Sequence, residues 1–410
     1  MTAPGGARAR VLVVIGTRPE GIKLAPVVAA LRGRTDRIDA RVALTGQHTS
    51  LIDQVLDVFG MEIAWDLGIM REGQDLYDIV HGCLDGLRGI VREWQPHMLV
   101  VQGDTATVFV AALVGFFEHV AVAHVEAGLR SRDRRRPWPE EVFRRLTAVL
   151  ADLHFAPTPG ARDNLLADGV PGENVHVTGN SVVDAVRAVA ARPHQPANAA
   201  LRAALDSGRG LVLVTAHRRE SFGQPMREAF GALRALADRH PGIELLVPVH
   251  PNPNVLAAAD ELLSGHPRIR LTAPLDYRDL VFALERAALV ITDSGGIQEE
   301  APSFGTPVLV MREVTERPEG VHAGFVTLVG TNADLIARRA DELLGRRLEG
   351  MSKVGRPDAA DSMLRRTQTS VAAATISVYG DGRAGERIAD IIDHRLTGQP
   401  RSTTDWSGPP

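Results

Sequence analysis

The stretch Leu-Val-Ile-Thr-Asp-Ser-Gly-Gly-Ile-Gln-Glu-Glu-Ala-Pro, residues 289–302, sets out the plan on which the chain is built. Its first four residues, Leu289–Thr292, are apolar or β-branched and predict a short buried strand. Small residues follow, and a helix-forming segment begins at Ile297. A strand that passes through a small-residue turn into a helix is the βα unit of a parallel sheet.

Short apolar runs of the same kind recur along the chain and alternate with longer Ala, Leu and Arg-rich segments of helical period. This alternation is typical of repeated βα units, so the sequence predicts the α/β class with parallel sheets. The predicted buried strands are Val11–Ile15, Arg41–Leu44, Met98–Val101, Val120–His124, Val175–Val177, Leu211–Thr215, Glu244–Pro248, Arg268–Leu271, Leu289–Thr292 and Val308–Met311.

A change of composition near the middle of the chain indicates more than one domain. Residues 190–198 contain two prolines and no apolar stripe, which predicts a surface loop soon after a boundary near Thr178–Asn180. Two doubly wound domains fit the strands better than one large sheet. Residues 397–410 have neither apolar period nor helix formers, and we expect them to be disordered.

Composition excludes several classes of protein. Over 410 residues, 46 Lys and Arg stand against 50 Asp and Glu, a net charge of −4 that gives no reason to expect nucleic acid. The single cysteine, Cys83, excludes an internal disulfide and a thiolate zinc site, so we expect a cytoplasmic protein. The longest apolar run, Val108–Phe117, is about half of the roughly 20 residues that a membrane span needs, and it predicts a buried helix.

The residues directly after the strands are the ones expected to meet a ligand, because open parallel sheets bind beyond the carboxyl ends of their strands. Val11–Ile15 leads to Arg18 and Pro19, with Lys23 one turn into the following helix. Pro19 suits the first helical position, so the Arg18 guanidinium would add to the positive end of a helix dipole, which favours phosphate. A plain surface ion pair of Arg18 is the alternative.

Carboxylates follow two further strands of the first half. Asp104 comes after Met98–Val101, and Glu126 comes after Val120–His124. Paired acids at strand ends suggest general acid and base catalysis. Asp104 could equally cap a helix, whereas Glu126 is followed by Ala-Gly, which offers no such structural task.

Glu140 and Glu141 stand at a predicted helix start, after a basic segment over 130–136. The helix dipole stabilises acids in a first turn, which is the structural alternative for at least one of the two. The basic segment is typical of a solvated loop, and the net charge does not favour a polyanion site.

The second half contains a candidate site histidine and a candidate anion-binding turn. His217 follows the strand Leu211–Thr215 and is a candidate for phosphate contact or proton transfer. His250 lies between prolines, and its alternative role is that of a residue in a rigid turn.

Ser294, Gly295 and Gly296 would present backbone amides to a pyrophosphate, and Glu300 could accept hydrogen bonds from a ribose. No Gly-x-Gly-x-x-Gly or Walker lysine loop follows a strand, and no spacing fits a metal cage. The residues alone therefore predict a two-domain enzyme for a nucleoside diphosphate compound, with no bound cofactor or metal.

Nine stretches together resemble a known family. They read GTRPEGIKLAP (16–26), TGQH (45–48), QGDT (102–105), HVEAGLR (124–130), PWPEE (137–141), TAHRRESFG (215–223), PVHPNPN (248–254), TDSGGIQEEAP (292–302) and TERPEG (315–320). From about Val11 to Ile392 the chain resembles the non-hydrolysing UDP-N-acetylglucosamine 2-epimerase family.

The resemblance implies two Rossmann-like domains of glycosyltransferase-B type facing each other across a cleft, in a homodimer. It assigns residues 8–179 and a returning helix at about 380–396 to the first domain, and residues 180–379 to the second. It also implies a reaction that interconverts UDP-N-acetylglucosamine and UDP-N-acetylmannosamine. UDP leaves carbon 1 as the carbon 2 proton is removed, which gives 2-acetamidoglucal, and UDP then adds back with carbon 2 protonated on the other face.

The resemblance also implies roles for residues of this chain. Asp104, Glu126 and Glu140 match the catalytic carboxylates, and Lys23 matches a residue needed near the active site. Arg18, His217 and the Ser294, Gly295 and Gly296 amides match the pyrophosphate contacts. Glu300 matches the ribose contact, Leu275 a backbone contact to uracil, and Arg317 a further substrate contact. Some members are activated by UDP-N-acetylglucosamine bound beside the active site, and Gln47, His48 and Arg218 lie in the corresponding motifs.

Three positions depart from the family pattern. Phe143 replaces a small polar residue, Leu280 stands where an aromatic residue is common, and Ser377-Val378 replace Asn-Pro. These departures bear on the fine structure of the substrate and on domain closure, and not on the class of reaction.

Three other functions remain open at this point. A hydrolysing 2-epimerase would release UDP and free N-acetylmannosamine. A retaining glycosyltransferase would leave the first-domain carboxylates without an evident task. A non-catalytic nucleotide-sugar sensor would bind the same compound without turning it over.

Overall fold

The structure is a computed structural model that describes residues 8–46, 49–71, 73–218, 221–353 and 378–408. The chain divides into two compact units. Unit 1 comprises Met1–Ala185 and Tyr379–Pro410, and unit 2 comprises Val186–Val378. The domain boundaries expected from the family resemblance, after residues 179 and 379, remain a prediction.

Unit 1 contains a seven-stranded parallel sheet in the order β3-β2-β1-β4-β5-β6-β7. Its strands are β1 (Ala9–Ile15), β2 (Ile38–Leu44), β3 (Trp65–Asp66), β4 (Met98–Gln102), β5 (Ala121–Val125), β6 (Leu153–Ala156) and β7 (Val175–Val177). Its helices are α1 (Arg18–Arg32), α2 (Thr49–Phe59), α3 (Leu76–Trp94), α4 (Ala106–Phe117), α5 (Glu140–Leu150), α6 (Pro159–Ala167), the short η1 (Gly172–Asn174), α7 (Ser181–Ala190), which runs on into unit 2, and α16 (Ala384–Thr397).

Unit 2 contains a six-stranded parallel sheet in the order β10-β9-β8-β11-β12-β13. Its strands are β8 (Gly210–Thr215), β9 (Ile243–Pro248), β10 (Ile269–Thr272), β11 (Leu289–Thr292), β12 (Val308–Val310) and β13 (Val326–Leu328). Its helices are α8 (Ala199–Asp206), α9 (Gln224–Arg239), α10 (Pro253–Leu263), α11 (Tyr277–Arg286), α12 (Gly295–Glu300), η3 (Ala301–Phe304), α13 (Pro318–His322) and α14 (Ala333–Lys353).

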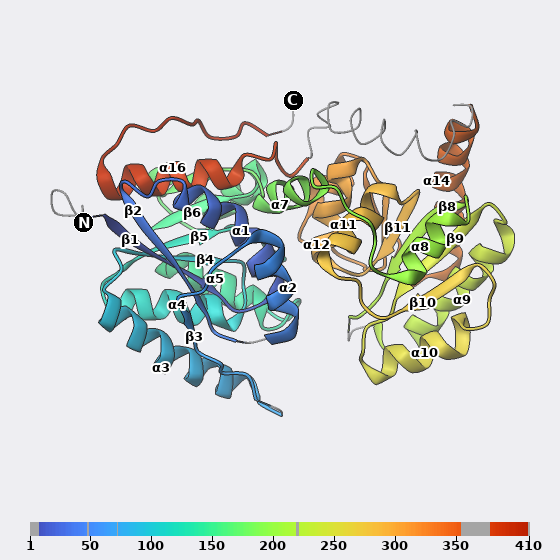
Figure 1. Ribbon diagram of the computed structural model, residues 1–410, viewed down its shortest axis with the longest axis horizontal. Coiled ribbons are helices and arrows are strands. Elements are labelled where there is room, and N and C mark those ends of the chain that lie inside the picture. The colour runs from blue at the N-terminus through green and yellow to red at the C-terminus, as the bar shows by residue number, and fades with distance from the viewer. Residues whose placement is uncertain (1–7, 47–48, 72, 219–220, 354–377, 409–410) are drawn as a thin grey trace. The chain divides into compact units, whose positions relative to one another are not determined.

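All ten predicted strands are present, and the predicted α/β class is confirmed. The strands are continuous apolar runs because helices cover both faces of each sheet. In unit 1, Leu12 and Val14 of β1 face a core formed with α3 and α4. Because side chains alternate along a strand, the intervening residues of β1 face the opposite side of the sheet. The helices α1 and α16 lie on that side (Figure 1). In unit 2, one core joins the sheet to α9, α10 and α14, and a second joins it to α8 and α11.

Each sheet has one point at which the strand order reverses. In unit 1, β1 pairs with β2 on one side and with β4 on the other. In unit 2, β8 pairs with β9 and with β11. A topological switch point of this kind opens a crevice beyond the carboxyl ends of the two central strands. The loops after β1 and β4, and those after β8 and β11, are therefore the expected ligand-binding positions.

The chain returns to unit 1 through α16, which packs on α1 (Figure 1). Asp184 of α7 accepts hydrogen bonds from the backbone amides of Ala384 (3.2 Å) and Gly385 (2.8 Å), and so holds the first turn of α16. Burial raises the pKa of this carboxyl to about 6, although both amides lower it.

The segment after α16 corrects the prediction of a disordered tail. The backbone amide of Trp406 donates to the Val177 carbonyl of β7 at 2.7 Å, and the Trp406 side chain is buried. Asp390 accepts hydrogen bonds from the backbone amides of Ser402 and Thr403, each at 2.8 Å. Residues 398–408 thus pack along unit 1 in an extended conformation.

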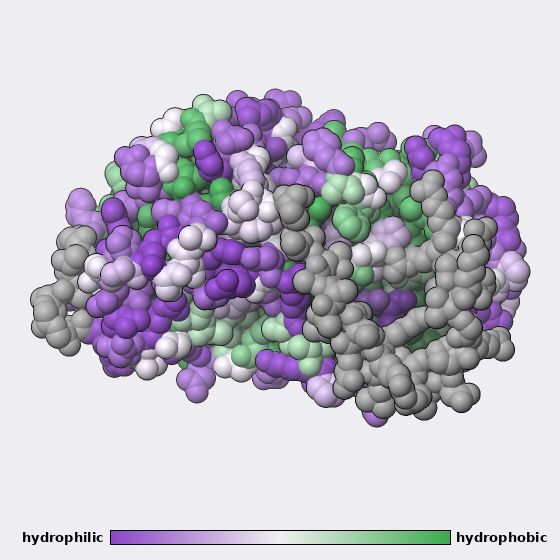
Figure 2. All heavy atoms as spheres, turned by 90° about the horizontal axis from the view of Figure 1, so that it is seen from above, coloured by the Kyte–Doolittle hydropathy of each residue, from purple (hydrophilic) through white to green (hydrophobic). Residues whose placement is uncertain are grey.

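No helix within the described ranges is long and apolar enough to cross a membrane. The apolar run Val108–Phe117 lies within α4, most of whose residues are buried, as predicted. Figure 2 shows one face of the molecule, on which hydrophilic residues cover much of the surface.

Candidate active site

The loop after β1 brings Arg18 to the start of α1, as predicted. Thr17 is the N-cap residue, but its hydroxyl donates to Glu20 (2.9 Å) instead of accepting from the helix amides. Gly16 packs tightly, since a Cβ atom at this position would lie 2.4 Å from the Thr107 hydroxyl oxygen. Arg18 is half-buried there, beside the positive end of the helix dipole.

Glu126, directly after β5, lies against Lys23. The Lys23 ammonium and the Gln102 side-chain amide each donate to Glu126 Oε2 at 2.5 Å. Glu126 and Lys23 are only 9% and 6% exposed, so the ammonium offsets the cost of burying the carboxylate. Glu126 has a left-handed backbone with φ of 63°, which is uncommon for a residue with a side chain. Two donors and a fixed backbone hold this carboxylate in one orientation.

Asp104 is not a helix cap, because Thr105 caps α4. Asp104 forms an ion pair with Arg144 of α5, which also bonds Glu141 at 3.2 Å. Glu141 in turn accepts from the backbone amides of Ser131 (3.0 Å) and Arg132 (3.2 Å). Glu141 therefore fixes the basic segment 130–136 to α5. Glu140, the residue before it in sequence and the first residue of α5, is half-buried.

His124 of β5 supports the loop that carries Asp104. Its Nε2 lies 2.7 Å from the carbonyl oxygen of Gly103, which has a left-handed φ of 87°. Burial lowers the pKa of His124 to about 3, although the hydrogen bond to Gly103 raises it. The neutral ring therefore donates from Nε2 to this carbonyl and holds the backbone directly before Asp104.

In unit 2, His217 follows β8 and Asp293 follows β11, at the switch point. His217 Nδ1 lies 2.9 Å from Asp293 Oδ1, and the backbone amides of His217 and Arg218 both donate to Asp293 Oδ2 at 2.8 Å. Burial raises the pKa of Asp293, but the hydrogen bonds from His217 and the two amides outweigh it, and the net shift is downward. An ionised Asp293 thus fixes the His217 ring, whose side chain is 41% exposed.

The His217 ring also stacks on His250, with centroids 5.9 Å apart. Burial lowers the pKa of His250, and the neighbouring His217 lowers it further. His250 is therefore part of the support of His217, which the sequence interpretation of a rigid turn did not include.

Ser294, Gly295 and Gly296 form the start of α12 directly after Asp293, as the sequence predicts. A Cβ atom at Gly295 would lie 3.0 Å from Arg317 Nη1, while Gly296 is open. Arg317 pairs with Glu299 (2.7 Å) and with Glu316. These pairs hold the guanidinium beside the backbone of Gly295.

The remaining predicted residues are distributed as follows. Glu300 is buried and accepts a long hydrogen bond from the Tyr277 hydroxyl at 3.5 Å. Leu275 is buried in the core under α8 and α11. Arg218 Nε donates to the Asp293 carbonyl at 3.1 Å. Gln47 and His48 lie outside the described residues.

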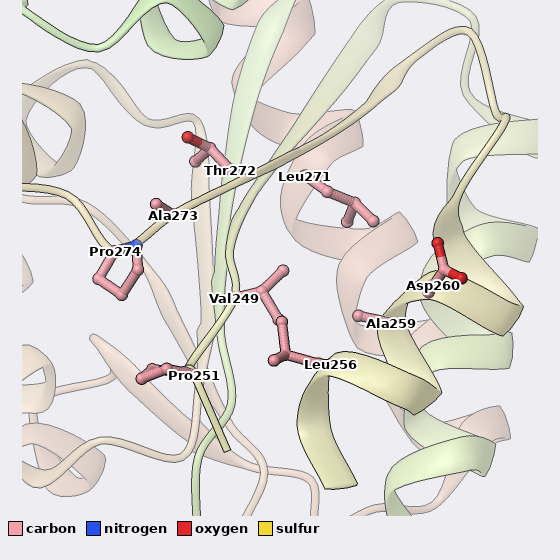
Figure 3. A pocket seen from close by; sticks show the side chains of 9 residues that line it. All are labelled: Val249, Pro251, Leu256, Ala259, Asp260, Leu271, Thr272, Ala273 and Pro274. Carbon is pink, nitrogen blue, oxygen red and sulfur yellow. The ribbon is translucent and has the colours of Figure 1, made fainter. Parts of the chain in front are cut away.

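A cavity of about 430 Å³ lies in unit 2 between α10 and the ends of β9 and β10 (Figure 3). Its lining is mostly apolar and includes Val249, Leu256 and Leu271, with Asp260 at one side. None of the predicted site residues that the structure describes lines this cavity.

Two of the three departures from the family pattern have a local explanation. The Phe143 ring stacks on Phe109 of α4 with centroids 5.4 Å apart and an interplanar angle of 8°, so it packs α5 against α4. Leu280 packs against the core that contains Leu275. Ser377 lies outside the described residues, and Val378 is buried.

The predicted groups thus collect at two switch points. Unit 1 holds the carboxylates with Lys23 and Arg18, and unit 2 holds His217 and the amides of α12. The sequence missed several residues that support them, among them Glu20, Gln102, Arg144 and Asp293. Within the described ranges, no group of three or more His, Cys, Asp or Glu side chains is arranged to hold a metal ion.

Comparisons with known proteins identify relatives of this chain. Residues 29–393 match the family model described as UDP-N-acetylglucosamine 2-epimerase. A UDP-N-acetylglucosamine 2-epimerase from Yersinia pestis is 44% identical over 394 residues, which cover 95% of this chain and 100% of the relative.

Solved structures give the same result. The S. aureus MnaA–UDP co-structure is 39% identical, with a TM-score of 0.84 over 97% of this chain and 100% of that chain. The UDP-GlcNAc 2-epimerase from Neisseria meningitidis bound to UDP-GlcNAc is 35% identical, with a TM-score of 0.80 over 93% of this chain and 99% of that chain. At 13% identity and a TM-score of 0.59, a glycotransferase of kitacinnamycin shares the fold, as expected for the glycosyltransferase-B class. The chain therefore belongs to the UDP-N-acetylglucosamine 2-epimerase family.

Proposed function

We propose that this epimerase is of the non-hydrolysing type and interconverts UDP-N-acetylglucosamine and UDP-N-acetylmannosamine through 2-acetamidoglucal. The contact of buried Glu126 with Lys23 and Gln102 is the observation that carries the proposal, because it fixes a carboxylate for proton transfer. The Neisseria meningitidis relative binds UDP-GlcNAc, which supports the choice of substrate.

The proposed reaction has two half-steps. A carboxylate removes the proton from carbon 2, the electron pair of that bond forms the double bond to carbon 1, and the bond from carbon 1 to oxygen breaks as UDP leaves. In the return step UDP attacks carbon 1, and carbon 2 takes a proton on the opposite face. Inversion needs acid and base groups on both faces, and the candidates are Asp104, Glu126 and Glu140.

The carbon 2 proton is weakly acidic, so stabilisation of the departing UDP must lower most of the barrier. Removing one preorganised donor to such a developing charge typically costs about 100- to 1000-fold in rate. We assign this task to Arg18, to His217 and to the backbone amides of Ser294–Gly296. The Asp293 contacts hold His217 in place for it before the substrate binds.

The other site residues complete the proposal. Glu300 would accept from the ribose, Leu275 would offer its backbone to uracil, and Arg317 would contact the substrate further. Gln47, His48 and Arg218 would bind a second molecule of UDP-N-acetylglucosamine as an activator. A reducing cytoplasm suits the single cysteine, Cys83, which is buried.

We also propose that the enzyme is a homodimer. Apolar side chains are exposed on α4 and α5, which pack against each other in unit 1. Phe116 and Phe117 are each 60% exposed, and Val149 is 82% exposed. A second copy of the chain covering such side chains would remove apolar surface from water.

Incubation with UDP-N-acetylglucosamine in heavy water, followed by proton NMR, tests the proposal. We expect two UDP-linked epimers, both labelled with deuterium at carbon 2. Free N-acetylmannosamine and UDP would instead identify a hydrolysing enzyme. Unchanged substrate with measurable binding would identify a sensor, and inversion without entry of label would rule out the elimination.

A further inference from the structure

The carboxylate of Glu20 joins two loops that carry candidate site residues. Its Oε2 accepts a hydrogen bond from the Gly16 backbone amide at 2.6 Å. Its Oε1 accepts from the hydroxyls of Thr17 (2.9 Å) and Thr105 (2.8 Å). Gly16 and Thr17 form the loop directly before Arg18, and Thr105 comes directly after Asp104.

We infer that Glu20 is a positioning residue, which ties the loop after β1 to the loop after β4 and so sets the positions of Arg18 and Asp104. The tie itself is independent of the reaction, whereas its importance for catalysis rests on the proposed function. Because β1 and β4 meet at the switch point, a single side chain can reach both loops there.

An ordinary acid in the first turn of a helix does not explain these contacts. Such an acid serves its own helix by interacting with the dipole or with the N-cap amide. Glu20 instead reaches Thr105, which is 85 residues away in sequence. The Thr105 hydroxyl donates to Glu20 and accepts only a long bond from the Val108 amide (3.5 Å), so it links Glu20 to the first turn of α4.

Burying the charged form of the Glu20 carboxyl costs free energy. The residue is 2% exposed, and burial raises the pKa of its carboxyl to about 7, although the Gly16 amide and both threonine hydroxyls lower it. The Asp104 carboxylate, at the end of the other loop, raises this pKa further. Burial raises the pKa of the Cys83 thiol of α3, and the Glu20 charge raises it further. A buried carboxyl kept at such a cost, with three donors from two loops, has a positional task.

The geometry predicts which substitution is tolerated. In Glu20→Gln the amide oxygen can accept from Gly16, while the amide nitrogen donates to the two hydroxyls, which can reverse their roles. In Glu20→Ala all three donors lose their acceptor. A displacement of about 1 Å in a catalytic site can cost on the order of 100-fold in rate.

The test combines hydrogen–deuterium exchange with epimerisation kinetics on the full chain. We expect Glu20→Ala to speed exchange at both 16–17 and 103–105, and to lower kcat about 100-fold with KM changed less than about threefold. Glu20→Gln should leave exchange near that of the wild type and kcat within about tenfold. Glu93→Ala, at an exposed glutamate of α3, is the control and should change neither.

A second pair of variants keeps the test decisive if Glu20→Ala does not fold. Thr105→Ser retains the hydroxyl and should behave as the wild type, whereas Thr105→Val should speed exchange at 16–17, in the other loop. Unchanged exchange at 103–105 in Glu20→Ala, or a kcat in Glu20→Gln as low as in Glu20→Ala, would overturn the inference. If the wild type does not epimerise the substrate, the proposed function fails, while the exchange data still decide whether the tie exists.

Discussion

A single backbone conformation places the candidate base. The left-handed conformation costs a residue with a Cβ atom about 1–2 kcal/mol, yet Glu126 adopts it. Gln102 lies at the end of the neighbouring strand β4 and Lys23 lies on α1, and both hold the Glu126 carboxylate. Such strain persists where the surrounding contacts over-determine the conformation, which is typical of functional sites.

Glu126→Gln is expected to remove the proton transfer. The amide has the same shape but cannot take a proton, so the rate of deuterium entry at carbon 2 should fall by about 100- to 10,000-fold. The measurement is proton NMR in heavy water. Glu173→Gln, at an exposed position of the same unit, should exchange at the wild-type rate. Exchange in Glu126→Gln close to that of the wild type would show that another group removes the proton.

The raised pKa of Glu20 also predicts a pH dependence of stability. The folded protein binds this proton more tightly than the unfolded chain, so the contribution is complete below pH 4.5 and is lost as the pH rises through about 7. The loss amounts to about 3 kcal/mol above that pH. Glu20→Gln does not titrate and does not lose this contribution. Its urea midpoint should therefore rise relative to that of the wild type as the pH increases from about 5 to about 8.5. Parallel midpoints for the two proteins would contradict this prediction.

The motifs identified the candidate site residues, but not the groups that hold them. The ion pair between Arg144 and Asp104 joins residues that are 40 positions apart in the sequence. The hydrogen bond from the His217 backbone amide to the Asp293 carboxylate joins residues that are 76 positions apart. Pairs of this kind depend on which strands are neighbours in the sheet, and strand order is not written in any local pattern. Arg144 stands three residues after Glu141, which is the spacing of an ordinary ion pair within a helix. Its contact with Asp104 becomes evident only when the end of β4 is known to lie nearby.

Among the elements, α16 approaches α1 more closely than most helices can. A Cβ atom at Gly385 would lie 2.8 Å from the backbone carbonyl carbon of Pro26, so the glycine permits the contact. The Asp184 carboxylate accepts hydrogen bonds from two backbone amides in the first turn of α16. The returning helix is thus fixed at its first turn on two sides.

Gly385→Ala should therefore destabilise the protein, although alanine normally favours a helix. The new methyl group must displace backbone, and overpacking of this kind costs about 1–3 kcal/mol. Gly231→Ala in α9, where nothing lies within 4 Å, should instead raise stability by up to about 1 kcal/mol. Urea unfolding measures both. Equal effects of the two substitutions would show that α16 can shift away without cost.

The segment after α16 covers β7, the edge strand of the first sheet. Trp406 contributes both a backbone hydrogen bond to Val177 and a buried ring. Covering an edge strand protects its unpaired amides and carbonyls. We expect Trp406→Ala to lower the free energy of unfolding by about 3 kcal/mol. Trp138→Ala, at a position that is 68% exposed, should change it by less than about 0.5 kcal/mol, and a similar small loss for Trp406 would contradict the edge contact.

Most of the predicted strands are apolar runs of four or more residues, although β7 and β12 have only three residues each. The missed strands are short or interrupted. The strand β3 has two residues, β13 has three, and β6 contains the buried His154. The terminal segment was missed because it has no period to detect, since its order comes from backbone bonds to β7 and from one tryptophan.

At the scale of the whole molecule, both units follow the same plan, with a parallel sheet and functional groups at its switch point. The proposed dimer would bury the exposed apolar side chains of α4 and α5, which include Phe116, Phe117 and Val149. Val149→Glu should convert the proposed dimer to a monomer in light scattering, because it places a charge where apolar surface would be buried. Val314→Glu, at a 56% exposed position of unit 2, is the control and should remain dimeric. A monomeric wild type at micromolar concentration would rule out the dimer.

The return of α16 to the first unit has a consequence during synthesis. Residues 186–378 contain the whole of unit 2, so that unit can mature while the ribosome is still translating. The first unit begins earlier but is sealed later, since the helix that closes it leaves the exit tunnel only after unit 2. In the nascent chain, the surface of α1 that α16 later covers therefore stays without this helix until unit 2 has been translated.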